Sequence, residues 1–388
     1  MVDIIFFWFP LFLLFHSYVV FPVMLHLLAR RKDDSEIIYN QNDLLPFVSV
    51  ILSVYNEEQI IEQRIRNIYA SNYPIEKFEV LVGSDGSNDR TNIILQQLQN
   101  EFSSLRTFLF NQRKGKGNVL NSIVGDANGE ILILTDAKVQ FSPQAVFQLI
   151  KHFRNAEIGI VGANIINRFT RKDGISVQEK RFMSREIAIK HNEGKLWGIV
   201  MGAYGACYAI RSELFITIPL NFAVDDFFIT LNAMENGAKG IIELNAICYE
   251  EVPNLMAEEF RRKVRISSGN YQNLKAFIHL LLKFNPLSFC FFSHKVIRWI
   301  GPFLLLVSFI SNIMILSHSN FYLYTLVIQL VLLVVPLFDF FLHKIHIHII
   351  TLRFVTHFYS MNLALLIGFI KYLKGVKTDV WEPTKREH

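Results

Sequence analysis

The sequence predicts an α/β domain of the doubly wound, Rossmann-like kind joined to α-helical transmembrane segments. Three observations predict this. Apolar residues make up 51% of the 388 residues, and 35 of them are phenylalanine. Charged residues are only 19%, a composition too apolar for an ordinary soluble protein. Between residues 47 and 134, β-branched apolar runs alternate with helical patterns, which is typical of a parallel sheet.

Residues 1–29 are expected to form an N-terminal transmembrane helix. Ile4 to Leu28 is almost uninterrupted apolar sequence, long enough to cross a hydrocarbon layer of about 30 Å. Arg30, Arg31 and Lys32 follow at once, whereas a cleaved signal peptide carries its charges before the apolar run. By the positive-inside rule, the carboxyl end of this helix and the domain after it face the cytoplasm.

The sheet domain is expected over residues 30–275. Its buried strands are predicted at Phe47–Val54, Phe78–Val82, Thr107–Phe110 and Ile131–Leu134. The helices between them are predicted to begin at Asn56, with Gln59 at capping-box spacing, to span Thr91–Leu98, and to carry Val119, Leu120 and Ile123 on one face. Ligands of a doubly wound sheet bind at the carboxyl ends of its strands, so polar residues there are candidate site residues.

Four of these polar residues suit a nucleotide diphosphate: Glu57, Asp85, Lys116 and Asp136. A Walker lysine loop and a G-x-G-x-x-G motif are both absent from the sequence, which disfavours a nucleoside triphosphatase or a dinucleotide enzyme. Each residue also has an ordinary structural interpretation. Asp85 can start a turn at Asp-Gly, Lys116 can be a solvated charge, and Asp136 can cap a helix.

Asp225 and Asp226 form an adjacent pair of carboxylates next to large apolar side chains. Charged groups beside Val224 and Phe227 lose hydration, which raises their pKa and makes them candidate proton acceptors near neutral pH. We therefore predict that Asp226 is a general base. The alternative is that the pair caps a helix over Phe228–Asn236, because Asp is a favoured N-cap residue.

The motifs together resemble the family 2 glycosyltransferases. The matching stretches are V-S-V-I-L-S-V-Y-N-E-E, E-V-L-V-G-S-D-G-S-N-D-R-T, K-G-K-G-N-V-L-N, I-L-I-L-T-D-A-K, G-A-Y-G-A-C-Y-A-I-R, V-D-D-F-F-I-T and R-R-K-V-R-I-S-S-G-N, which fall between Val48 and Asn270. The resemblance is to the membrane-integrated polysaccharide synthases, whose members include cellulose, hyaluronan and poly-N-acetylglucosamine synthases.

The resemblance implies a GT-A nucleotide-sugar domain in the inner (plasma) membrane. Glu57 and Asp85 would hold the uridine of a UDP-sugar, and Lys116 would approach its diphosphate. Asp136 stands at the first Asp of the family's D-x-D motif, which binds the donor and a divalent metal, Mg²⁺ or Mn²⁺. Lys138 replaces the usual second Asp. That change weakens metal binding, or lets Lys138 supply part of the metal's charge at the phosphates.

The carboxylate pair matches the family's acidic motif. Asp226 would deprotonate an acceptor hydroxyl that attacks the anomeric carbon from the face opposite UDP, with inversion of configuration. Asp225 occupies the position where this motif usually has Glu. Gly202, Tyr204 and Gly205 are expected on the acceptor side, where small residues let a sugar approach the backbone. An ordinary turn is the equal alternative for these residues.

Arg262 and Arg265 occupy the place of the family's Q-x-x-R-W motif, and the resemblance implies that both lie at the donor diphosphate. Ile266 replaces the motif's Trp, the usual platform for the acceptor sugar in processive synthases, so processivity is left open. The remaining charges of these two helical regions are expected to be solvated: Glu179, Lys180, Arg181 and Arg185, then Glu258, Glu259, Arg261 and Lys263.

The chain after residue 275 is expected at the membrane. Residues 276–295 are predicted as an interfacial helix, residues 296–373 as transmembrane helices, and residues 374–388 as a basic tail. The spans are Val296–Leu316, Phe321–Leu342 and Ile349–Leu373, and the last contains Arg353, His357 and Asn362, which should face a channel or another helix. Four spans in all place the tail outside, whereas its positive charges favour the cytoplasm; a re-entrant segment would resolve this.

The predicted activity is inverting transfer from a UDP-sugar to a growing exopolysaccharide or capsular glycan. Single-sugar transfer to a lipid acceptor is one alternative, and a degenerate transferase acting as a sugar-nucleotide-binding assembly subunit is another. Membrane lipid and export or assembly subunits are the expected partners. The net charge of +5 is spread along the chain, so nucleic acid is not expected. The cysteines Cys207, Cys248 and Cys290 lack metal-ligand or disulfide spacing.

Overall fold

The structure, a computed structural model, describes residues 2–32, 37–168, 176–251, 256–345, 347 and 349–376. The chain divides into two compact units. The helical unit comprises Met1–Leu27, Thr170–Phe182 and Pro253–Gly375, and the sheet unit comprises Leu28–Phe169, Met183–Val252 and Val376–His388. The predicted basic tail, residues 374–388, lies outside the described residues from residue 377 onward.

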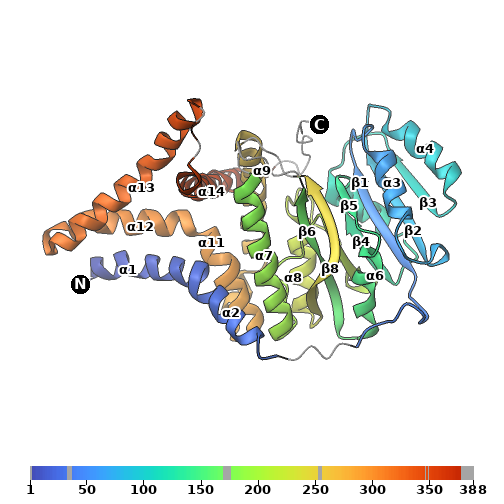
Figure 1. The fold of residues 1–388 in the computed structure, drawn as a ribbon, viewed down its shortest axis with the longest axis horizontal. Coiled ribbons are helices and arrows are strands. Elements are labelled where there is room, and N and C mark those ends of the chain that lie inside the picture. The colour runs from blue at the N-terminus through green and yellow to red at the C-terminus, as the bar shows by residue number, and fades with distance from the viewer. Residues whose placement is uncertain are drawn as a thin grey trace. The chain divides into compact units, whose positions relative to one another are not determined.

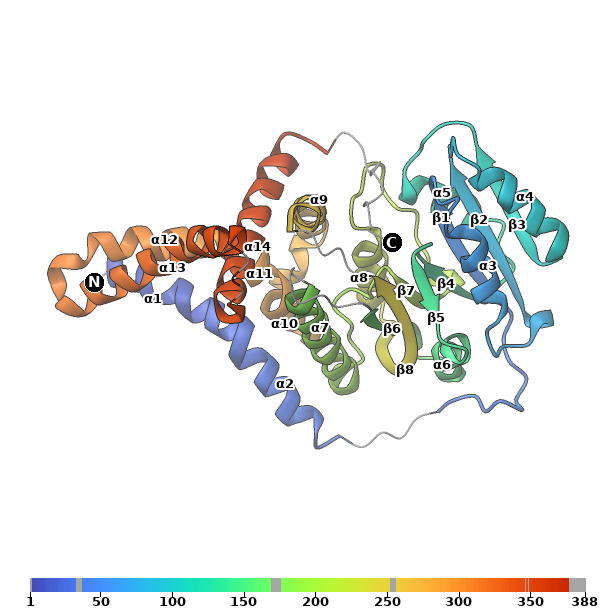
Figure 2. The ribbon, with the colours of Figure 1, turned by 45° about the horizontal axis from the view of Figure 1, so that its top comes forward.

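The sheet unit is built on one eight-stranded sheet in the order β3-β2-β1-β4-β7-β6-β8-β5. The strands are β1 (Val48–Val54), β2 (Phe78–Asp85), β3 (Leu105–Phe110), β4 (Ile131–Thr135), β5 (Val139–Phe141), β6 (Ile158–Arg168), β7 (Cys207–Arg211) and β8 (Lys239–Glu251). β1 to β4 are mutually parallel, and β7 runs antiparallel to both β4 and β6. Figures 1 and 2 show β1, β2 and β3 side by side. All four predicted strands are therefore confirmed.

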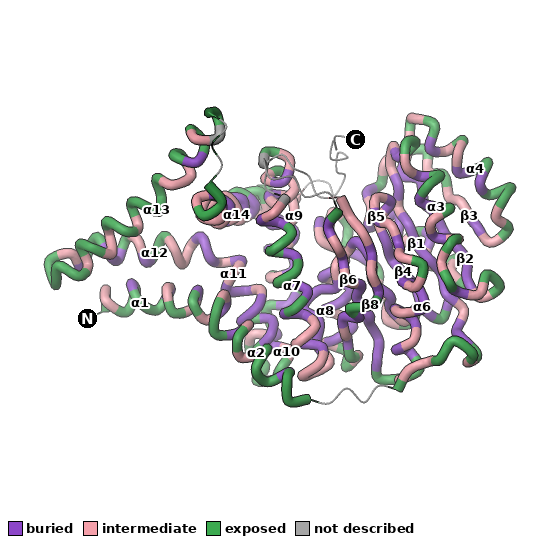
Figure 3. The backbone as a smooth tube through the Cα atoms, viewed as in Figure 1, coloured by how far each residue is buried: buried purple, intermediate pink, exposed green. Residues whose placement is uncertain are grey.

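β1, β2 and β4 form the core of the sheet unit, whereas most of β3 is only partly buried. Val48, Val50 and Ile51 of β1 are fully buried, and every residue of β2 and β4 is buried. Strands covered on both faces read as continuous apolar runs, which is why the sequence pattern located them. In Figure 3, the tube is coloured mostly as buried along β1, β2 and β4.

Short helices connect the strands of the sheet unit. They are α3 (Ile61–Tyr69), η2 (Ile75–Lys77), α4 (Thr91–Glu101), α5 (Lys116–Val124), α6 (Ala145–Ile150), η3 (Lys151–Arg154), η4 (Ser212–Leu214) and α8 (Asp225–Glu235), together with α7 (Ser176–Trp197) from Met183 onward. α5 packs on β1 and β2, and α6 packs on β6 and β8. Helices therefore follow the strands as the doubly wound pattern predicts.

The predicted helix start at Asn56 is wrong. α3 begins only at Ile61, and Asn56 has a left-handed backbone with φ of 51°. Its side chain instead joins the ends of two strands: the Asn88 N–H donates to Asn56 Oδ1 at 3.0 Å, and Asn56 Nδ2 donates to Asn88 Oδ1 at 2.7 Å. Asn tolerates this backbone conformation, and the paired amides hold the loops after β1 and β2 together.

The helical unit contains the apolar helices of the chain. They are α1 (Val2–Phe15), η1 (His16–Val20), α2 (Phe21–Ala29), α9 (Met256–Ala276), η5 (Ile278–Leu282), α10 (Pro286–Cys290), η6 (Phe291–Val296), α11 (Ile297–Trp299), α12 (Gly301–Met314), η7 (Leu316–His318), α13 (Asn320–Lys344) and α14 (Ile350–Leu373). Figure 3 shows an exposed stretch on α13, whereas exposed, intermediate and buried residues alternate along α1. The exposed residues of both helices are mostly apolar.

Three helices among the described residues are long and apolar enough to cross a membrane: Val2–Ala29, Asn320–Leu342 and Ile350–Leu373. Pro286–Trp299 and Gly301–Met314 make a fourth candidate if they count as one broken span, since they are bent by 63°. Where the sequence predicts a single span over Val296–Leu316, the helix thus breaks at Ile300, immediately before Gly301 and Pro302. Proline at the first turn of a helix permits such a break. These candidate helices are consistent with a membrane protein.

Polar residues of α14 face other helices, as the sequence predicts. Arg353, His357 and Asn362 are each less than a tenth exposed. Gly301 of α12 lies against Asn362, so close that a Cβ on this glycine would be 3.0 Å from the Asn362 oxygen. Three short helical segments, η5, α10 and η6, take the place of the single interfacial helix that the sequence predicts over residues 276–295.

Candidate active site

The predicted polar residues of the sheet unit gather at one edge of the sheet. Glu57 follows β1, Asp85 ends β2, Lys116 begins the helix after β3, and Asp136 follows β4. Because β1 to β4 run parallel and in register, these four positions lie at the carboxyl ends of neighbouring strands. This edge is where doubly wound sheets bind their ligands.

Lys116 forms the centre of a charged cluster at this edge. Its Nζ donates to Asp136 Oδ1 at 2.8 Å and lies 3.9 Å from Asp225 Oδ2. Burial alone lowers the pKa of Lys116, but the carboxylates of Asp136 and Asp225 outweigh it and hold the pKa above its ordinary value. Lys116 is therefore a permanent cation near neutral pH. It is not the solvated charge of the alternative interpretation.

Asp226 lies beside this cluster, in the first turn of α8. Its Oδ1 accepts a hydrogen bond from the Phe227 N–H at 2.9 Å. Burial, reinforced by the neighbouring Asp225, raises the pKa of Asp226 to about 6, against the lowering effect of Lys116. Val224 is the N-cap residue of α8, without a side-chain cap bond, so the aspartate pair does not cap the helix. A carboxyl with this pKa is suited to accept a proton near neutrality.

The glycines before β7 make room for the residues of α8. A Cβ on Gly205 would lie 2.8 Å from Asp226 Oδ2, and a Cβ on Gly202 would lie 2.6 Å from the Phe227 ring. Gly202 also has a positive φ of 77°, a conformation that favours glycine in a turn. Between them, the Tyr204 ring lies 5.8 Å from Lys190 Nζ.

Asp85 anchors the loop that leads to Lys116. Its Oδ1 accepts from the Lys114 N–H at 2.6 Å and its Oδ2 from the Gly115 N–H at 3.1 Å. Arg113 lies 3.8 Å from the same carboxylate and stacks on the Tyr55 ring at 3.5 Å. The sequence reasoning missed this Tyr55–Arg113 pair, since the two residues are separated by two strands.

Glu57 pairs with the lysine that departs from the family's motif. Glu57 is 7% exposed, and its Oε1 lies 3.6 Å from Lys138 Nζ. The Glu57 N–H donates to the Thr91 hydroxyl at 2.9 Å, which fixes the loop after β1. Lys138 itself lies in the turn between β4 and β5. The structure therefore places Glu57 and Lys138 together.

The side chains at this edge do not fit a divalent metal ion. Among the described residues, no group of three or more His, Cys, Asp and Glu side chains is arranged to hold one. Asp136 is already bonded to the Lys116 ammonium, and Lys138 stands where a second carboxylate would be needed. Mg²⁺ and Mn²⁺ favour carboxylate oxygens, and neighbouring ammonium groups repel them.

The sequence did not predict two buried residues near Asp225 and Asp226. Lys190 of α7 is 8% exposed and lowers the pKa of Asp226. Tyr208 of β7 is 1% exposed, and burial together with the site's aspartates raises the pKa of its hydroxyl. Glu186, Lys190 and Glu193 repeat at helical spacing and are all buried, a polar stripe that could have indicated Lys190.

Arg262 and Arg265 belong to α9 of the helical unit. The Arg262 guanidinium donates to both carboxylate oxygens of Glu259, through Nε at 2.9 Å and through Nη2 at 2.9 Å. The Arg265 carbonyl accepts from the Ser268 hydroxyl at 2.7 Å. Their role at the donor diphosphate stays a prediction.

The prediction of solvated charges is wrong for part of these helices. Glu179 is 1% exposed and Glu259 is fully buried, whereas Lys180, Arg181, Arg185 and Arg261 are exposed as predicted. Glu179 Oε1 pairs with His357 Nε2 at 2.6 Å, and its Oε2 pairs with Lys263 Nζ at 3.2 Å. Buried carboxylates are tolerated when cations surround them, a tertiary effect that local spacing does not reveal.

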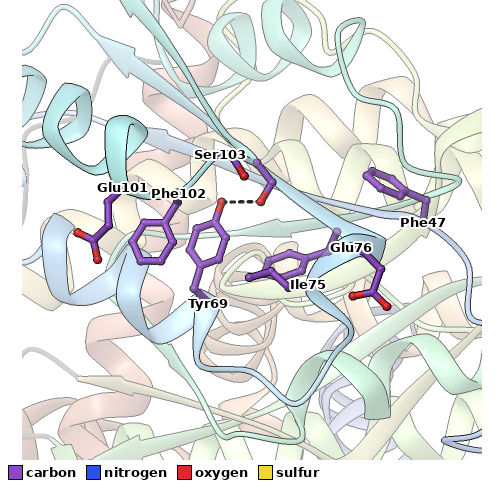
Figure 4. A pocket seen from close by; sticks show the side chains of 9 residues that line it. Phe47, Tyr69, Ile75, Glu76, Glu101, Phe102 and Ser103 are labelled. Carbon is purple, nitrogen blue, oxygen red and sulfur yellow. Dashed lines mark hydrogen bonds between the residues drawn. The ribbon is translucent and has the colours of Figure 1, made fainter.

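A pocket of about 440 Å³ lies at the other edge of the sheet (Figure 4). Phe47, Phe78 and Ser104 line it where the first three strands begin, and the Tyr69 hydroxyl lies 3.0 Å from that of Ser104. None of the predicted site residues lines this pocket. It is therefore separate from the charged cluster at the carboxyl ends of the strands.

Comparison with known proteins finds a family model for part of the chain. Residues 49–218 match the model of the family described as Glycosyl transferase family 2. Over this stretch the chain is similar to the family 2 glycosyltransferases. The matched stretch contains four of the predicted site residues, Glu57, Asp85, Lys116 and Asp136.

The curated relatives include transferases that are named for different products. The probable glycosyltransferase YdaM of Bacillus subtilis is 23% identical over 281 residues, 70% of this chain and 66% of that protein. A beta-monoglucosyldiacylglycerol synthase of Trichormus variabilis is 31% identical over 119 residues, 30% of this chain and 25% of that one. A poly-beta-1,6-N-acetyl-D-glucosamine synthase of Staphylococcus aureus is 24% identical over 241 residues, which are 60% of this chain and 56% of that protein. This chain thus covers less than two thirds of the length of each relative.

A solved glycosyltransferase shares the fold over nearly the whole chain. The mannosyltransferase PcManGT of Pyrobaculum calidifontis, solved with GDP-Man and Mn²⁺, superposes with a TM-score of 0.69 at 19% identity. The match covers 96% of this chain and 99% of that one. The predicted GT-A, Rossmann-like fold is confirmed.

Proposed function

We propose that this chain is an inverting membrane glycosyltransferase that transfers a sugar from a UDP-sugar to a growing exopolysaccharide or capsular glycan. One observation carries the proposal: Asp226, with a pKa raised to about 6, stands beside the Lys116–Asp136–Asp225 cluster at the ligand-binding edge of a glycosyltransferase sheet. That arrangement supplies a proton acceptor next to a cation that can face a diphosphate.

The reaction is a single displacement at the anomeric carbon. The acceptor oxygen forms its bond to that carbon while the bond to the donor phosphate breaks, and the electron pair leaves with the nucleoside diphosphate. Asp226 takes the acceptor's hydroxyl proton. Asp225 raises the pKa of Asp226 and helps to hold Lys116 in place. Attack opposite the leaving group inverts the configuration.

Donor recognition falls to the loops after β1 and β2. Asp85 would accept from uracil N–H or ribose hydroxyls, since each carboxylate oxygen has a second lone pair beyond the backbone bonds already described. Glu57 would do the same after releasing Lys138. Arg262 and Arg265 would contribute at the diphosphate. The Mg²⁺ or Mn²⁺ that the family resemblance implies at Asp136 is no part of this mechanism, because the side chains there do not fit it.

The acceptor is proposed on the side of Gly202, Tyr204 and Gly205. A glycan acceptor is supported by the similarity to the poly-beta-1,6-N-acetyl-D-glucosamine synthase. A lipid acceptor is the second candidate, favoured by the similarity to the beta-monoglucosyldiacylglycerol synthase together with the candidate spans. In both cases the protein is proposed as a multi-pass protein of the inner membrane with its catalytic domain in the cytoplasm, working with membrane lipid and with export or assembly subunits.

The test is release of nucleoside diphosphate by membranes that contain the protein. A panel of UDP-sugars is supplied, with GDP-mannose added because the solved relative binds it. We expect turnover of one UDP-sugar and its loss in Asp226→Asn. A polymeric product supports the first candidate, and a single glycolipid supports the second. Nucleotide binding without turnover of any donor, in the presence of both acceptor types, would contradict both and favour an assembly subunit.

A further inference from the structure

We propose that the chain neutralises the diphosphate of its donor with the ammonium groups of Lys116 and Lys138 and without a divalent metal. The inference rests on the proposed function and concerns the same edge of the sheet. It is carried by the side chains at the two places where the family's D-x-D motif stands, Asp136 and Lys138.

Lys116 already compensates the acidic residues that a metal would need. Its Nζ lies 2.8 Å from Asp136 Oδ1 and 3.9 Å from Asp225 Oδ2, so one ammonium bridges both carboxylates. The Lys116 side chain is 25% exposed. Its ammonium repels a divalent ion at Asp136, whereas it attracts a diphosphate.

Lys138 adds a second positive charge to the same edge. It lies two residues after Asp136, and Glu57 holds its Nζ at 3.6 Å. At that distance Glu57 and Lys138 form an ion pair, which keeps the ammonium at this edge of the sheet. A lysine ammonium is a point charge on a flexible stem and binds phosphate well. Two lysines therefore provide the two positive charges that a bound metal ion would otherwise bring.

This arrangement accounts for the charge that develops during transfer. When the bond between the anomeric carbon and the phosphate oxygen breaks, the electron pair and the negative charge stay on the nucleoside diphosphate. Lys116 and Lys138 lie where that charge forms, and neither has to give up a proton. The acceptor's proton goes to Asp226. Residues of this chain therefore take up the proton and stabilise the negative charge.

The experiment measures nucleoside diphosphate affinity by calorimetry, and nucleotide release, in EDTA and in Mn²⁺. For the full-length protein in detergent, we expect UDP affinity and turnover in EDTA to lie within threefold of their values in Mn²⁺. Lys138→Asp places a carboxylate opposite Glu57. It should lose at least tenfold in UDP affinity in EDTA and recover most of it in Mn²⁺.

Controls separate this inference from folding and from the proposed function. Lys138→Asn removes the charge without adding a carboxylate, and should weaken UDP binding equally in both conditions. Lys239→Gln, at an exposed lysine outside the site, should change neither quantity. A loss above threefold for the unmodified protein in EDTA that Mn²⁺ restores would overturn the inference. If UDP and GDP bind but no donor is turned over, the proposed function fails, and the effect of EDTA on binding still decides the metal question. Binding of neither nucleotide contradicts both.

Discussion

Two charge clusters in this chain differ in how completely their charges are balanced. In the sheet unit, the ammonium of Lys116 faces three carboxylates: Asp136 and Asp225 within 4 Å, and Asp226, which also raises the pKa of Lys116. The excess negative charge leaves Asp226 with a pKa of about 6. This cluster, which we propose to be catalytic, is therefore held in an unfavourable state of charge.

The cluster of the helical unit is balanced. Glu179 and Glu259 lie within 4 Å of Arg262 and Lys263, and Glu179 also pairs with His357. Each carboxylate thus has at least two cationic or hydrogen-bonding partners, which hold the pKa of Glu179 low despite its burial. This structural cluster connects α7, α9 and α14 by ion pairs.

The contrast separates a cluster that we propose to be reactive from one in which the charges are paired. An unbalanced cluster keeps a carboxyl with a shifted pKa at some cost in folding stability. In a balanced cluster each carboxylate is paired with cations, and its members are costly to remove singly because a charge is then left without its partner. The same substitution of acid by amide should therefore have opposite effects in the two clusters.

Asp226→Asn should produce the largest effect. Loss of the general base is expected to lower turnover by about 10²–10⁴-fold. Stability should rise at pH 7.5. The folded pKa of about 6 exceeds the ordinary 3.8, so folded protein binds more protons and its stability falls as pH rises through that window. Removing the carboxylate should raise the free energy of unfolding by about 1–3 kcal/mol. Nucleotide release and thermal unfolding measure the two quantities, and an active or less stable variant would contradict the account.

Glu179→Gln should act in the opposite direction on stability. The amide cannot neutralise Lys263 and His357, so we expect a loss of about 3 kcal/mol, seen as a lower unfolding temperature in detergent. Glu258→Gln, on the same helix as Lys263 but only half-buried, is the matched control and should unfold near the unmodified protein. Equal unfolding temperatures for the two variants would show that the balanced cluster is not structural.

Gly205→Ala should disturb the catalytic cluster without unfolding the domain. The new Cβ would lie 2.8 Å from Asp226 Oδ2, so the carboxylate must move. A shift of this size is expected to lower turnover by about tenfold or more. Gly125→Ala is the matched control, because a Cβ there meets nothing within 4 Å. Equal turnover in the two alanine variants would mean that the position of Asp226 does not matter.

Lys239→Gln should have the smallest effect. Lys239 and Glu157 form an exposed ion pair at 2.8 Å, outside both clusters. Exposed pairs contribute less than about 1 kcal/mol because water and salt screen them. Unfolding temperature and turnover should both stay close to those of the unmodified protein. A large loss here would show that burial and balance do not separate the sites as we argue.

The sequence predicted the parts of the fold that depend on local patterns. β1, β2 and β4 were located because strands buried on both faces are continuously apolar, and the polar residues at their ends were found for the same reason. Asp226 was predicted to be a base from its apolar neighbours. That role stays a prediction, and burial is the largest cause of its raised pKa.

What the sequence missed depends on contacts between distant segments. Asn56 shows capping spacing, yet its amide pairs with Asn88 across two strand ends, so the helix begins later. Glu179 sits in a polar stretch that resembles a solvated face, and only the partners from α9 and α14 explain its burial. Lys138 was recognised as a departure, but its pairing with Glu57 was not foreseen.

The most direct test of the central claim is the pH dependence of turnover between pH 5 and 8, in the unmodified protein and in Asp225→Asn. Asp226 must be deprotonated to act, so turnover should rise with pH and reach half its maximum near pH 6. Asp225 raises the pKa of Asp226, so the variant's midpoint should move to lower pH. A flat profile, or the same midpoint in both proteins, would contradict a base activated by an unbalanced cluster.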